Sequence, residues 1–114
     1  MIRTSYHFET QKRGSLFCVC LYGEIDHHNA VGLREELDRL LLRERPRRFV
    51  LDLAHIEFMD SSGLGLLMGR YRLMKELGGE MAITRANERV RKILRLSGME
   101  RFMEIDADGK GEEQ

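Results

Sequence analysis

Two serines directly behind an aspartate are the residues of this sequence whose types and spacing can do chemistry. Asp60, Ser61 and Ser62 lie between an apolar run and a long segment with helical character. A serine hydroxyl at such a place can act as a nucleophile, and Asp60 or either serine can equally be no more than the cap of the following helix. The spacing alone leaves both interpretations open.

The segment behind the serines contains Gly63, Gly65 and Gly69. Each glycine in a helix interior costs up to about 1 kcal/mol relative to alanine, so three of them predict the close approach of another surface. The apolar side chains of this segment point in several directions round the helix, and we expect part of this surface to be left for a partner. They are Leu64, Leu66, Leu67 and Met68.

Hydrolytic and metal chemistry are poorly supported. A hydrolase elbow has the form GxSxG, and the first glycine is missing around both serines. Nothing in the spacing of the four histidines couples one of them to a serine, and the adjacent His27 and His28 diverge at a helix start. Cys18 and Cys20 share one face of an extended strand, which favours two buried thiols. We therefore expect no catalytic residue, no metal and no cofactor.

The elements that must position the serines follow from hydrophobic periodicity and from turn residues. Strands are predicted at 2–9, 16–22, 49–53, 79–84 and 101–105, and helices at 28–44, from about 62 to 78, and 87–98. Gly14 lies in the turn of an opening hairpin, Gly23 closes the second strand, and Pro46 follows the first helix. The order predicts an α/β fold with a mixed sheet, antiparallel in the hairpin and parallel across the helices, which pack mainly on one face.

The size and charge of the chain limit what it can be. Its 114 residues, 42% of them hydrophobic, fit one small domain, which we place at 1–105, with a disordered acidic tail at 106–114. Nineteen basic residues balance nineteen acidic ones, which argues against a general attraction to nucleic acid. No signal peptide and no run of roughly 20 apolar residues is present, so we expect a cytoplasmic protein without membrane contact.

Four motifs together carry a resemblance to a known family. They are GEIDHHNA (23–30), FMDSSGLGLLMGRY (58–71), GGEMAI (78–83) and VRKILRLSGM (90–99). In order and spacing, over roughly residues 3 to 105, they resemble the bacterial anti-sigma factor antagonists, the single-domain members of the STAS family. Within that family the likeness is strongest to the sporulation members that act on an anti-sigma-F factor. Such members usually continue into one more helix after the last strand, where this sequence has its acidic tail.

The resemblance implies a regulatory binding protein and not an enzyme. Ser62 would be phosphorylated by the partner, an anti-sigma factor that is itself a serine kinase, and a serine phosphatase would reset it. The unphosphorylated form would bind the kinase and release the sigma factor. The residues expected at this interface are Glu24, Asp26, Asp60, Ser61, Gly63, Leu64, Gly65 and Met68.

Three alternatives remain to be compared with the structure. The same fold and the same Ser62 would serve in a general stress pathway with a different kinase. A phosphoaspartate receiver domain also presents an aspartate after a strand, but such domains begin strand–helix, whereas this chain opens strand–strand. Nucleic-acid binding would depend on basic residues in and before the third helix, for which a solvated helix face is the simpler interpretation. They are Arg85, Arg89, Arg91, Lys92 and Arg95.

Overall fold

The computed structural model describes residues 6–106. Within that range the chain forms five strands, three α-helices and one short 3₁₀ helix. The strands are β1 (Tyr6–Arg13), β2 (Leu16–Ile25), β3 (Arg48–Met59), β4 (Glu80–Thr84) and β5 (Glu104–Asp106). The helices are α1 (Ala30–Glu44), α2 (Ser61–Glu76), α3 (Glu88–Leu96) and the 3₁₀ turn η1 (Met99–Arg101).

The strands form one mixed sheet in the order β1-β2-β3-β4-β5. β1 and β2 pair as an antiparallel hairpin, while β2 with β3, β3 with β4 and β4 with β5 are parallel. This confirms the predicted mixed sheet. The order also differs from the 2-1-3-4-5 order of receiver domains, and this difference excludes that alternative.

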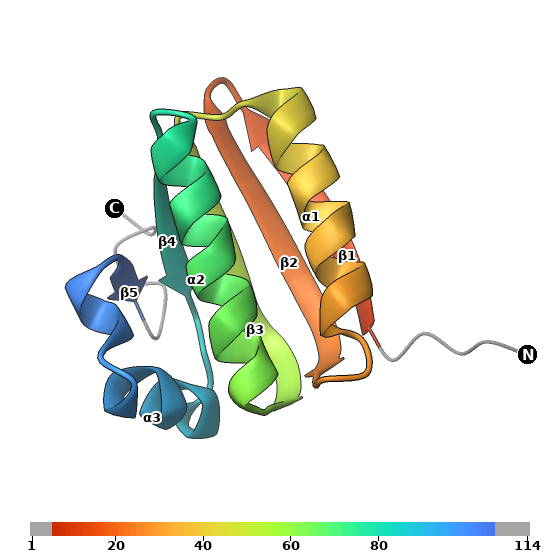
Figure 1. Cartoon of the computed structure of the whole chain (residues 1–114), viewed down its shortest axis with the longest axis vertical. Helices are drawn as coiled ribbons and strands as arrows, with labels where there is room; N and C mark the ends of the chain where they lie inside the picture. The colour runs from red at the N-terminus through yellow and green to blue at the C-terminus, as the bar shows by residue number, and fades with distance from the viewer. Residues whose placement is uncertain (1–5, 107–114) are drawn as a thin grey trace, which may run out of the picture.

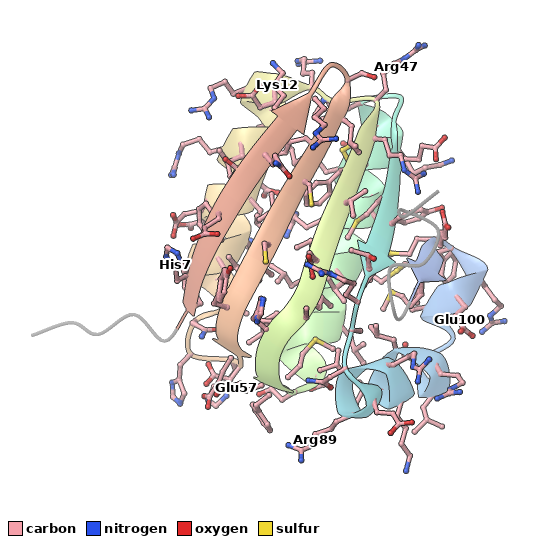
Figure 2. All side chains as sticks on the ribbon, turned by 180° about the vertical axis from the view of Figure 1, so that it is seen from behind. His7, Lys12, Arg47, Glu57, Arg89 and Glu100 are labelled. Atoms are coloured by element: carbon pink, nitrogen blue, oxygen red, sulfur yellow. The ribbon has the colours of Figure 1, made fainter. Side chains whose placement is uncertain are left out.

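The helices α1 and α2 lie side by side over one face of the sheet and begin at the same end of the molecule (Figure 1). The core fills the space between these helices and the sheet, with Val19, Leu37, Leu51 and Leu67 fully buried. η1 lies beside β5, and α3 lies below β5, towards the end of the molecule where α2 begins (Figure 1). In the opposite view no helix crosses the other face of the sheet in the described range (Figure 2). The prediction that the helices pack mainly on one face is therefore confirmed.

Several predicted boundaries were wrong. β2 continues through Gly23, which has a φ of 107°, to Ile25, and β3 continues six residues beyond Leu53 to Met59. The extended ends of β2 and β3 pair with each other, with register shifts between them. Each extension is therefore stabilised by its pairing with the other. At the other end of the chain, Arg101, expected to open the last strand, is instead the last residue of η1, and β5 begins only at Glu104.

Other expectations have mixed outcomes. Asn87 caps α3 as predicted, because its Oδ1 accepts a hydrogen bond from the Val90 N–H at 2.9 Å. Cys18 and Cys20 are not joined in a disulfide, and they are half-buried on the uncovered face of the sheet and not buried as predicted. Between residues 6 and 106 no helix is both long and apolar enough to span a membrane. Of the expected acidic tail, residues 107–114 lie outside the described range.

Candidate functional site

The aspartate of the serine loop caps α2. Asp60 is the N-cap residue, in an extended conformation, and its Oδ1 accepts a hydrogen bond from the Ser62 N–H at 2.8 Å. The Asp60 carbonyl accepts a second bond from the Gly63 N–H at 2.9 Å. The capping interpretation of Asp60 is therefore confirmed, and it leaves both serine hydroxyls available. Ser61 is exposed and Ser62 half-buried.

The loop between β2 and α1 is held by reciprocal side-chain bonds. Asp26 Oδ1 accepts hydrogen bonds from the N–H groups of His28 and Asn29, at 2.9 and 3.1 Å. Asn29 Oδ1 accepts from the Asp26 N–H at 3.0 Å, and its side-chain amide donates to the Glu24 carbonyl at 2.8 Å. Asp26 thus shapes this loop, while the side chain of Glu24 is exposed.

The structure brings the β2–α1 loop and the serine loop together, as expected from the family resemblance. The Asp60 N–H donates to the Ile25 carbonyl at 3.1 Å, so the serine loop is anchored on the end of β2. Glu24 is the register partner of Phe58 at the ends of β2 and β3. Glu57 lies at this same lower end of the sheet (Figure 2). Several carboxylates therefore gather at the end of the molecule where α2 begins.

The ionised form of Asp60 is favoured at this place. Partial desolvation acts to raise the pKa of Asp60, but the hydrogen bonds from Ser62 and the proximity of His27 outweigh it and hold that pKa below its usual value. His27 Nδ1 lies 3.9 Å from Asp60 Oδ2. A negative charge therefore stands directly before Ser62 near neutral pH.

The three glycines of α2 differ in what a side chain at their positions would meet. A Cβ added to Gly63 would lie 2.2 Å from Cγ and 2.5 Å from Sδ of Met59, so this buried glycine lets α2 pack on the end of β3. The expectation that Gly63 leaves room for a partner is therefore wrong. A Cβ added to Gly65 or Gly69 would meet nothing within 4 Å. For these two, packing inside the described chain does not explain the glycine, and the argument for an approaching surface stands.

Of the four apolar side chains expected near the serines, only part of the surface remains accessible. Leu66 and Leu67 are buried, and Leu64 and Met68 are half-buried against the core. The exposed large apolar side chains include Val31 on α1, at 53%, and Phe58 on β3, at 44%. Val31 and Phe58 belong to the two segments that converge on the serine loop. The sequence analysis singled out neither residue as an exposed apolar side chain.

An ion pair between α1 and α2 was also not predicted. Arg70 is 5% exposed, and its Nε lies 2.7 Å from Oδ1 of Asp38. The N–H is not aligned with that oxygen, so the contact is mainly electrostatic. Burial lowers the pKa of Arg70, Asp38 opposes this, and the nearby positive charge of Arg34 lowers it further. The charge of Arg34 on α1 is therefore close enough to act on Arg70 of α2.

The basic residues considered for nucleic acid are partly neutralised. Arg85, with a positive φ of 59°, donates from Nε to Asp52 Oδ2 at 3.1 Å. Arg91 Nη2 lies 3.8 Å from Glu88 Oε2. Arg89, Lys92 and Arg95 remain exposed on α3, which fits a solvated helix face.

A mixed sheet with two helices on one face, and a capped serine loop at the ends of the parallel strands, define a small α/β domain with a polar site at one end. The chain belongs to the STAS domain family, whose sequence profile matches residues 7–110. It is 39% identical over 97 residues to an anti-sigma F factor antagonist of Paenibacillus polymyxa, covering 85% of this chain and 83% of that protein. It is 31% identical over 93 residues to an anti-sigma-B factor antagonist of Bacillus subtilis, covering 82% and 84%.

The fold is also that of the anti-sigma factor antagonist SpoIIAA. In its unphosphorylated form SpoIIAA matches with a TM-score of 0.76 and 24% identity over 92% of each chain. The phosphorylated form of SpoIIAA, a Bacillus cell fate determinant, matches with a TM-score of 0.70 and 23% identity over 94% of this chain and 97% of that one. The chain therefore has the fold that SpoIIAA has in both its unphosphorylated and its phosphorylated form.

Proposed function

We propose that this chain is an anti-sigma factor antagonist that is switched off by phosphorylation of Ser62. The names of its relatives support this function, and the observation that carries it is the serine loop itself. The Asp60 cap holds Ser62 at the start of α2, and Gly65, one turn further along, leaves open space beside it. A partner surface has room to approach this hydroxyl.

The chain acts as a substrate and a binding partner in this proposal, and the catalytic groups belong to the kinase. The Ser62 Oγ–phosphorus bond forms while the bond between the γ-phosphorus of ATP and the bridging oxygen of ADP breaks. The hydroxyl proton passes to a base of the kinase. A serine phosphatase restores the hydroxyl by hydrolysis. Of the two serines, Ser61 is the more exposed, and the assignment to Ser62 follows the family resemblance.

Local electrostatics account for the switch. A phosphate adds roughly −1.5 to −2 charge, next to Asp60 and close to the loop that contains Asp26. An interface that had accepted a neutral hydroxyl would then have to desolvate this charge. We propose that Glu24, Asp26, Asp60, Ser61, Leu64, Gly65 and Met68 contribute to this interface, and that Gly63 supports it only through packing. The kinase is released because the surface of this chain that it contacts has become more acidic.

The experiment is incubation with ATP and the candidate anti-sigma kinase of the same genome, followed by phosphopeptide mass spectrometry. We expect phosphate on Ser62, lost in Ser62→Ala and kept in the control Ser61→Ala. The phosphorylated chain should bind the kinase at least about tenfold more weakly, which corresponds to about 1.4 kcal/mol. Phosphate on Ser61 alone, or on neither serine, would contradict the proposal.

A second circuit is supported by the relative from Bacillus subtilis, which is named for sigma-B. In a general stress pathway the same Ser62 would be used by a different kinase. Parallel reactions with each candidate kinase of the genome distinguish the two circuits. The sporulation assignment predicts that the anti-sigma-F kinase phosphorylates Ser62 fastest, and it is wrong if a stress kinase does so.

A further inference from the structure

Ser62 and the cationic side chain of Arg34 both line a groove between the first turns of α1 and α2. It has a volume of about 280 Å³. Its lining comes from both helices, with Ala30, Val31 and Arg34 on α1 and Ser62, Gly65 and Leu66 on α2. Arg34 is the residue of this lining that carries a charge. Arg34 and Ser62 therefore line the same groove from two different helices.

The charge of Arg34 is available within the described part of the chain. The ion pairs among residues 6–106 do not include Arg34. The acidic residue one turn further along α1, Asp38, is already engaged by Arg70 at 2.7 Å. Arg34 nevertheless lines the groove between the helices, and its charge also acts on Arg70. Arg34 therefore lies at the groove without a carboxylate partner among residues 6–106.

The groove also has room for a phosphoryl group. A Cβ on Gly65 would meet nothing within 4 Å, so the wall beside Ser62 is open where most residues would place a side chain. A guanidinium presents N–H groups in a planar fork that fits two phosphate oxygens. The flexible stem of Arg34 can bring this fork towards Ser62 without movement of either helix.

We propose that Arg34 is the ion-pair partner of the phosphate on Ser62. This inference rests on the proposed function, because it names the residue of this chain that receives the modification. Before phosphorylation Arg34 is a free cation on the surface that meets the partner. After phosphorylation it turns to the phosphate. The modification then changes that surface twice, by adding an anion and by withdrawing a cation.

Other charged groups also face this place. Asp60 stands before Ser62, His27 lies beside Asp60, and the β2–α1 loop contributes Asp26 and Glu24. The carboxylates raise the second pKa of a phosphate on Ser62, while a protonated imidazole or a guanidinium lowers it. The contribution of Arg34 must therefore be measured with His27 removed.

The test is a ³¹P NMR titration of the chain with phosphoserine installed at position 62 during translation, in a His27→Gln background. No kinase is needed, so the result is independent of whether a kinase uses Ser62. The second pKa of phosphoserine is about 6. We expect Arg34→Gln to raise it by about 0.5 unit or more relative to the parent, and Arg34→Lys to raise it by less. The matched control is Arg39→Gln, an equal charge change at an exposed position of α1 outside the groove.

Each outcome decides the inference. A rise in Arg34→Gln that is absent in Arg39→Gln supports a direct pair across the groove. Equal rises in both variants would show only the general field of the helix and would overturn the proposal, as would an unchanged pKa in Arg34→Gln. Neither of these results would argue against phosphorylation of Ser62, which the mass-spectrometric experiment tests separately.

Discussion

The charge and the capping role of Asp60 can be separated at the level of a single residue. The folded-state pKa of Asp60 lies below its unfolded value of 3.8. The ionised carboxylate therefore stabilises the fold above that pH, and this stability is lost as the pH falls through the folded-state pKa. Asp60→Asn keeps an oxygen that can cap Ser62 but does not titrate. Between about pH 5 and about pH 3, the urea midpoint should fall further in the parent chain than in Asp60→Asn.

The control for this prediction is Asp60→Ala, which removes both the charge and the cap. Its urea midpoint should lie below that of Asp60→Asn even at neutral pH, because the Ser62 N–H then loses its acceptor. If the parent and Asp60→Asn lose the same stability on acidification, the carboxylate charge contributes nothing to folding.

Gly63 and Gly65 provide a matched pair of substitutions two residues apart on one helix. Gly63→Ala should destabilise the fold by about 1–3 kcal/mol, because its methyl group collides with the buried Met59. Gly65→Ala should stabilise it by about 0.5–1 kcal/mol, because its methyl group meets open space and the backbone loses less entropy on folding. Urea denaturation measures both changes.

The same pair distinguishes a folding role from a binding role. Gly65→Ala should bind the anti-sigma kinase more weakly than the parent chain although it is the more stable protein. Unchanged affinity in Gly65→Ala would remove the argument that this glycine leaves room for a partner.

At the level of elements, the Arg70–Asp38 ion pair joins α2 to α1. The side chain of Arg70 is 6% exposed and that of Asp38 is 32% exposed. Asp38→Ala leaves a buried guanidinium without its counterion, and we expect a loss of about 3 kcal/mol. Arg70→Met replaces the buried charge with an apolar chain and leaves Asp38 within reach of water, so its cost should be smaller. Thermal or urea unfolding of the two variants gives the comparison, and an equal or larger loss in Arg70→Met would contradict it.

Elements with a strong local signal were predictable from sequence, and features that depend on distant partners were not. Pro46 marked the end of α1, and Asn87 was recognised as the cap of α3, since both signals are local. The extension of β2 through Gly23 was missed because a glycine normally ends a strand. Here β2 continues beyond the glycine because its residues pair with β3.

The candidate site shows the same division. The convergence of the GEID and DSSG motifs was expected from the resemblance, and the structure brings the two segments together through Asp60 and Ile25. The presence of Arg34 and Ser62 in one groove had no sequence signal, because it depends on how two helices 17 or more residues apart along the chain lie side by side. Gly63 was misjudged for a similar reason, since only the packed structure shows that Met59 occupies the space in front of it.

At the level of the whole molecule, phosphorylation should act without refolding. The fold matches SpoIIAA in both its unphosphorylated and its phosphorylated form, and the groove beside Ser62 already holds space and a cation. A ¹H–¹⁵N correlation spectrum of the chain with phosphoserine at position 62 should therefore differ from that of the free chain mainly in residues 24–34 and 58–69. Amides of β1, β4 and α3 should keep their chemical shifts, because these elements do not line the groove. Shift changes spread over all five strands would instead show that the phosphate repacks the core, and the switch would then be conformational.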